Sequence, residues 1–140
     1  MSTQTQTAQH PQALAGVRGG ADAAYGVLGM VTVAAIAVQI GLAGLGAFGG
    51  SFGPHLTLGY GIALLTLLML VASLIARPSG RVVLVTLLLF VLAGPIQPML
   101  ATLGSGGTAW LGALHAFDAV IIFGLTGWLM SQARARRTRT

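Results

Sequence analysis

Four long apolar runs constrain this chain more than any other feature of its sequence. They cover residues 24–48, 55–76, 82–102 and 109–130, and the only charged residue in them is Asp118. A helix rises about 1.5 Å per residue, so about 20 apolar residues cross the hydrocarbon core of a bilayer. The sequence therefore predicts an all-α integral membrane protein with four transmembrane helices.

The composition agrees with a chain that lives in lipid. Of its 140 residues, 55% are hydrophobic and 6% are charged, whereas about 25% of residues in soluble domains are charged. Glycine is abundant, as in membrane helices whose backbones approach closely. We expect contact seams between helices at six small residues: Ala37, Gly41, Gly44, Gly112, Ala116 and Gly127.

The positive charges lie at the ends of the apolar runs. All seven basic residues are arginines: Arg18, Arg77, Arg81, Arg134, Arg136, Arg137 and Arg139. Because short cytoplasmic loops are enriched in Arg and Lys, we expect a bacterial inner-membrane protein with both termini and the 77–81 loop in the cytoplasm. Despite a sequence pI of about 11.6, the arginines form no single basic face, which argues against nucleic-acid binding.

The chain divides into three regions by polarity. Residues 1–22 are polar and predict a flexible cytoplasmic tail, residues 23–131 hold the four spans, and residues 132–140 form a basic cytoplasmic tail. The first apolar run is longer than the hydrophobic segment of a signal peptide, which has roughly 7–15 residues. We therefore interpret it as a retained membrane anchor.

The first and third runs share a motif. Residues 39–46 and residues 97–104 both fit Q-x-x-L-A-x-L-G, and the run after each motif carries a histidine, His55 or His115. The pattern predicts two copies of one helical hairpin, arranged as an up-down four-helix bundle whose second and fourth spans lie on a diagonal. Chance similarity remains an alternative, because Leu, Ala and Gly are common throughout the chain.

A small set of polar residues falls in the outer half of the predicted spans. They are Gln39, His55, Gln97, His115 and Asp118. Polar side chains inside a bilayer are costly, face the bundle interior and often mark functional sites. We expect these five residues to meet in one layer.

One hypothesis for this layer is a b-type haem. His55 and His115 would be its axial ligands, because facing helices about 12–14 Å apart across a bundle diagonal can hold a porphyrin between two imidazoles. Gln39, Gln97 and Asp118 would orient the imidazoles by hydrogen bonds. Against this, His55 begins its run beside Pro54, and no Arg or Lys on the outer side pairs with haem propionates.

Three other interpretations of the layer stay open. The histidines can serve as hydrogen-bonding residues between helices, Asp118 and His115 can take part in a proton step, or His55, His115 and Asp118 can hold a metal ion.

Enzyme motifs are missing from the sequence. It has no cysteine, which excludes a thiol nucleophile. Its only acidic residues are Asp22 and Asp118, so a paired-carboxylate mechanism is hard to build. We expect no stand-alone catalysis. The favoured prediction is a structural or accessory membrane protein that packs in the lipid bilayer beside a larger complex or a second copy, with the haem-binding redox protein as the alternative.

Three segments carry a family resemblance: residues 38–46, residues 55–59 and residues 114–119. They resemble domain-of-unknown-function family 6220, whose Gln and His positions match Gln39, His55, Gln97 and His115. That family is similar over residues 24–131 and often has Asn where this chain has Asp118. A more distant similarity, to one half of haem A synthase and to b-type membrane cytochromes, implies histidine-held haem in such a bundle.

Overall fold

The computed structural model describes residues 5–138, with side chains from Gln12 onward, and this part of the chain contains no strand. Its elements are α1 (Thr5–Ala47), α2 (Gly53–Ala76), α3 (Gly80–Val91), the π-helical turn η1 (Leu92–Ile96), α4 (Gln97–Ser105) and α5 (Ala109–Arg137). Because α3, η1 and α4 follow one another without a break, they form one apolar span, Gly80–Ser105. The prediction of four membrane-length helices is confirmed.

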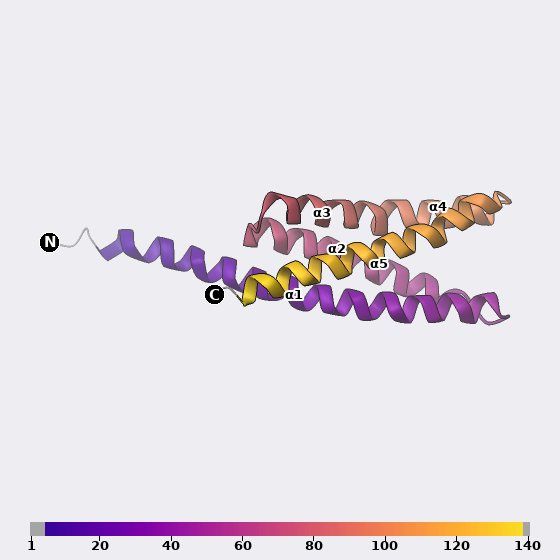
Figure 1. Cartoon of the computed structure of the whole chain (residues 1–140), viewed down its shortest axis with the longest axis horizontal. Helices are drawn as coiled ribbons and strands as arrows, with labels where there is room; N and C mark the ends of the chain where they lie inside the picture. The colour runs from indigo at the N-terminus through magenta and orange to yellow at the C-terminus, as the bar shows by residue number, and fades with distance from the viewer. Residues whose placement is uncertain (1–4, 139–140) are drawn as a thin grey trace.

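The helices form a bundle in which neighbours along the chain are neighbours in space (Figure 1). α1 packs on α2, α2 on the α3–η1–α4 span, that span on α5, and α5 returns to α1. Within the described residues, the backbones of α2 and α5 do not come close to each other. The second and fourth spans therefore lie on a diagonal, as expected.

The first helix begins earlier than the apolar run that predicts it. α1 starts at Thr5, and its N-terminal part projects beyond the other helices (Figure 1). A nucleated helix extends cheaply through residues that do not break it, so the polar segment before residue 24 continues the span. The flexibility expected for residues 1–22 stays a prediction, and residues 1–4 lie outside the described part of the chain.

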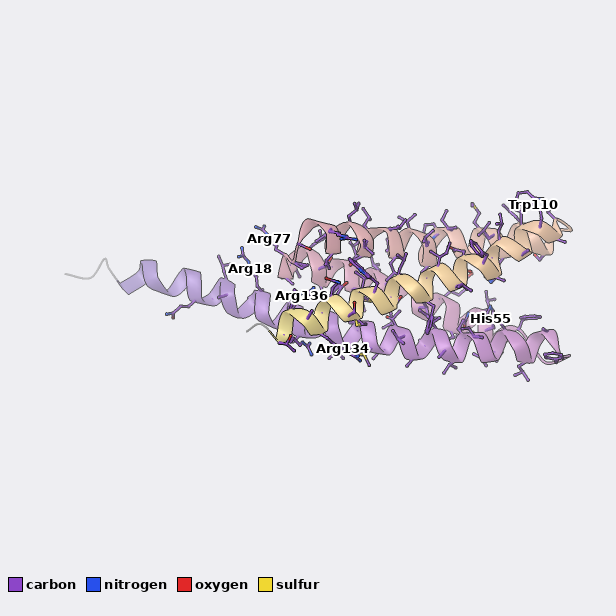
Figure 2. The ribbon with its side chains drawn as sticks, viewed as in Figure 1. Arg18, His55, Arg77, Trp110, Arg134 and Arg136 are labelled. Carbon is purple, nitrogen blue, oxygen red and sulfur yellow. The ribbon has the colours of Figure 1, made fainter. Side chains whose placement is uncertain are left out.

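The arginines gather at the end of the bundle where both termini lie. Figure 2 shows Arg18, Arg77, Arg134 and Arg136 at this end and His55 at the opposite one. The guanidinium of Arg81 lies 5.1 Å from the ring centre of Trp128. The expected separation of a basic end from an uncharged end is present, although Arg139 lies outside the described residues.

The bundle core places one fully buried threonine in each span. These residues are Thr32, Thr66, Thr86 and Thr126. Each hydroxyl donates to a main-chain carbonyl three or four residues earlier in its own helix, at 2.7–2.9 Å. Such local bonds satisfy a hydroxyl without a partner helix. Two of these threonines also contact another helix: the Oγ1 of Thr86 lies 2.8 Å from the hydroxyl of Tyr25, and the Oγ1 of Thr32 lies 3.6 Å from the Sδ of Met69.

Most of the expected glycine seams are wrong. A Cβ atom added to Gly41, Gly44 or Gly127 would meet nothing within 4 Å, and Ala37 and Ala116 are exposed. Only Gly112 lies at a close crossing, because a Cβ on Gly104 would come within 2.6 Å of the Gly112 nitrogen. In a glycine-rich membrane helix, composition alone does not distinguish a lipid-facing glycine from a packed one.

The third span contains one more residue than the first between its core and its glutamine. The core-facing residues of α1 are Tyr25, Gly29, Thr32 and Ile36, followed by Gln39. Those of the third span are Val82, Thr86, Leu89 and Ala93, followed by Gln97. The spacing is identical until the last step, where the third span has one extra residue.

The π-helical turn η1 absorbs this extra residue. The main-chain N–H of Gln97 donates to the main-chain carbonyl of Leu92, five residues earlier instead of the usual four. In a regular α-helix one extra residue would turn Gln97 by about 100° away from the core face. The wider turn of η1 therefore keeps Gln97 pointed into the bundle.

Candidate functional site: a layer of two glutamine–histidine pairs

The first pair joins α1 to α2 by two hydrogen bonds in opposite directions. The Nε2 of Gln39 donates to the main-chain oxygen of His55 at 2.8 Å. The Nδ1 of His55 lies 3.2 Å from the main-chain oxygen of Gln39. Because a carbonyl oxygen has two lone pairs, it accepts such a bond in addition to its helical one.

The second pair repeats this arrangement between α4 and α5. The Nε2 of Gln97 donates to the main-chain oxygen of His115 at 3.0 Å, and the Nδ1 of His115 lies 3.1 Å from the main-chain oxygen of Gln97. In both pairs the imidazole bonds a main-chain carbonyl, and the glutamine amide bonds the main chain of the histidine. The glutamine side chains thus tie helices together and make no hydrogen bond to the rings.

These bonds determine which imidazole nitrogen is available for other chemistry. Since a carbonyl oxygen can only accept, Nδ1 of each ring carries the hydrogen and donates it. In a neutral imidazole the lone pair is then on Nε2, the nitrogen that can ligate a metal. Both histidines share this tautomer, although they come from different helices.

The two imidazoles meet across the diagonal of the bundle. The ring centres of His55 and His115 are 6.2 Å apart, with an angle of 68° between the ring planes. The ring of Phe52 lies edge-on to His55, with centres 6.1 Å apart. Two helices whose backbones stay apart are therefore connected through their histidine side chains.

A cavity of about 130 Å³ lies beside the two rings. Gln39, His55, Gln97 and His115 all line it, and all four spans contribute to its wall. The remaining wall includes a set of small residues: Gly59, Ala63, Ala93, Gly94, Ala101 and Ala119. Four of the five predicted site residues therefore share one apolar cavity.

Asp118 is buried at the edge of this layer, with 6% of its surface exposed. Its polar neighbours are the side chains of Gln97 and His115. Within the described residues, its Oδ2 and the Oε1 of Gln39 are buried atoms without a hydrogen-bond partner. The corresponding residue of the first hairpin is Leu58, so the carboxyl group makes the two halves of the layer unequal.

The alternative of a metal ion held by three side chains is wrong. Among the side chains that the structure describes, from Gln12 onward, no three His, Cys, Asp or Glu residues gather closely enough to hold a metal ion. His55, His115 and Asp118 therefore do not form a ligand set by themselves.

Sequence reasoning missed two features of the site. Gly59 makes room for an amide, since a Cβ there would lie 3.2 Å from the Nε2 of Gln39. The turn η1 supplies Ala93 and Gly94 to the cavity wall. Pro95 and Pro98 could have indicated the π-helical turn, because prolines within a span often accompany a local change of helical geometry.

The comparisons with known proteins give one match. A model of the family of unknown function DUF6220 matches residues 39–103, which is the family that the sequence resembles. The matched segment includes Gln39, His55 and Gln97 and ends before His115. No curated protein and no solved structure matches the chain, so the similarity to haem A synthase stays an expectation.

Proposed function

We propose that this chain is a multi-pass membrane protein that holds a b-type haem between His55 and His115. The observation that carries the proposal is the pair of imidazoles from diagonal helices, with ring centres 6.2 Å apart. Both rings line the same cavity, so His55 and His115 would hold the haem iron from these two helices. A bound haem would supply one-electron redox chemistry there.

The hydrogen bonds of the layer support the same proposal. A ligating histidine usually donates its other ring N–H to a carbonyl or carboxylate, which fixes its tautomer and orientation. The Nδ1 atoms of His55 and His115 make such bonds to the main-chain oxygens of Gln39 and Gln97. Each ring therefore keeps Nε2 for a ligand.

The lining of the cavity includes several small residues beside the two rings. Its wall of glycine and alanine residues presents little bulk beside the rings. A porphyrin is larger than about 130 Å³, so its binding requires outward movement of nearby side chains. Leu56 and Tyr60 line the cavity and are more than half exposed, so neither is held by the core.

The test is a spectrum of the full chain expressed in haem-replete cells and purified in mild detergent. We expect a dithionite-reduced minus oxidised spectrum with a sharp b-type α band, at about one haem per chain. His55→Ala and His115→Ala should each abolish the band, because both axial positions are needed. The matched control is His10→Ala, which changes the third histidine of the chain and should leave the band unchanged.

The second candidate is a structural or accessory membrane protein without a cofactor or catalysis. Both glutamine–histidine pairs tie helices together with no added group, and the labelled arginines lie at the far end from His55 (Figure 2), so none pairs with propionates there. Its partner would be a larger membrane complex or a second copy. A colourless, folded and helical preparation would rule out the haem proposal and favour this candidate.

We also propose that the chain is a duplicated hairpin in a bacterial inner membrane, with both termini in the cytoplasm. The identical bonding of the two glutamine–histidine pairs supports duplication. Both termini lie toward the arginine-rich end (Figures 1 and 2), and the positive-inside rule assigns that end to the cytoplasm. Reporter fusions at residue 140 and in the 49–54 loop should report cytoplasm and periplasm respectively; the reverse result would overturn the orientation.

A further inference from the structure

We propose that the arginine-rich end of the bundle binds the phosphate of an anionic phospholipid headgroup. A second cavity, of about 290 Å³, lies there, far from the glutamine–histidine layer. Residues from α1, from the C-terminal end of α2 and the loop after it, and from the C-terminal end of α5 line this cavity. They are Asp22, Ala76, Arg77, Pro78, Arg136 and Arg137.

Arg136 has unused hydrogen-bonding capacity at this site. Its Nη2 donates to the Oδ1 of Asp22 at 2.8 Å, and its guanidinium lies 5.8 Å from the ring centre of Tyr25. Within the described residues, its Nε and Nη1 atoms are buried and have no hydrogen-bond partner. Buried donors are rarely left unpaired, and a phosphate accepts two parallel bonds from one guanidinium.

Arg77 is placed at the same cavity by the way α2 ends. It has φ 51°, the only positive φ of a non-glycine residue in the described chain, and its N–H donates to the carbonyl of Ser73. The following residue, Pro78, disfavours the right-handed helical conformation at Arg77, so the helix stops there. The left-handed conformation is uncommon for a residue other than glycine. Arg77 adopts it and lines the cavity.

The charge and the surroundings favour a lipid over a free anion. Among the described residues that line the cavity, Arg77 and Arg136 accompany one carboxylate, that of Asp22, so these two arginines carry more positive charge than Asp22 balances. Directly before this site, Leu74 and Ile75 are exposed on α2, so an apolar surface begins where the basic one ends. A headgroup in the cavity would leave its acyl chains along that surface, and basic groups at a membrane interface attract anionic lipids.

The experiment measures retained lipid on the full chain by native mass spectrometry, after incubation in detergent with phosphatidylglycerol or phosphatidylcholine. Arg77→Gln and Arg136→Gln should each weaken phosphatidylglycerol binding about fivefold. The matched control is Arg134→Gln, which removes the same charge from an exposed residue outside the cavity and should change binding less than about twofold. Asp22→Asn should strengthen binding, because it releases Arg136.

Several outcomes would overturn the proposal. An equal loss in all three arginine variants would show diffuse attraction to the basic end, and equal binding of both lipids would exclude recognition of anionic charge. Binding of inorganic phosphate alone, without preference for the lipid, would assign the site to a soluble anion. If Arg136→Gln does not fold, Arg77→Gln and Asp22→Asn still decide the matter through their opposite expected shifts.

Discussion

The two hairpins of this protein reach the same polar contact by different backbones. In the first, a regular α-helix brings Gln39 to His55; in the second, the π-helical turn η1 precedes Gln97 and brings it to His115. The bond lengths of the two pairs agree within a few tenths of an ångström. The side-chain pairing is therefore kept while the helix geometry adjusts around an extra residue.

The hairpins also differ at the glycine that ends the shared motif. A Cβ on Gly104 would meet the backbone of Gly112 at 2.6 Å, whereas a Cβ on Gly46 would meet the ring of Phe52 at 2.5 Å. Phe52 is 55% exposed and can turn away, but a backbone cannot. The same motif position is therefore a tight helix crossing in one hairpin and a loose contact in the other.

Deletion of one residue from either span should have the largest effect on the difference between the two hairpins. Deletion of Pro95 should convert η1 to a regular helix and keep Gln97 facing His115, with a change below about 1 kcal/mol in the free energy of unfolding. Deletion of Ala37 should turn Gln39 about 100° from His55 and cost on the order of 3 kcal/mol or more. Unfolding in SDS-containing mixed micelles measures both.

The two deletions control for each other, because each shortens one span by one residue. Equal destabilisation by both would contradict the view that η1 accommodates one extra residue. A more stable Pro95 deletion would agree with it.

Substitution of the motif glycines should have the next largest effect. Gly104→Ala should destabilise the bundle by about 1–3 kcal/mol, since the new methyl group forces α4 and α5 apart. Gly46→Ala should change stability by less than about 0.5 kcal/mol. Thermal melting in detergent compares them, and similar melting temperatures for both variants would show that the crossing at Gly112 is not tight.

Removal of the glutamine amides should have a smaller effect than Gly104→Ala. Gln39→Ala and Gln97→Ala should each cost about 0.6–1 kcal/mol, the usual value of a hydrogen bond between membrane helices. The loss should be slightly larger for Gln97, whose side chain also neighbours Asp118. Unfolding in mixed micelles would measure both losses and show whether Gln97→Ala is the more destabilising substitution.

The imidazole orientation should survive both glutamine substitutions, because main-chain carbonyls hold it. A haem spectrum lost in either variant, with the fold retained, would show that the amide itself is required.

Much of the site could be predicted from the sequence because polar residues are scarce in its spans. Four of the five predicted residues line one cavity, and Asp118 is buried beside them. The direction of the hydrogen bonds could not be predicted. Whether a glutamine amide meets an imidazole or a carbonyl depends on helix offsets of a few ångströms, which no spacing along one helix determines.

The four-helix membrane bundle follows from the sequence, because an apolar run of bilayer length satisfies its backbone hydrogen bonds in lipid by forming a helix. The sequence also placed Gln39, His55, Gln97 and His115 at one depth, since depth follows from position along each span. Helix packing, in contrast, determines which glycines touch another helix, where the third span widens, and which nitrogen of each imidazole is left for a ligand. Those features depend on rotation and offset between helices, and packing settles them after each helix has formed.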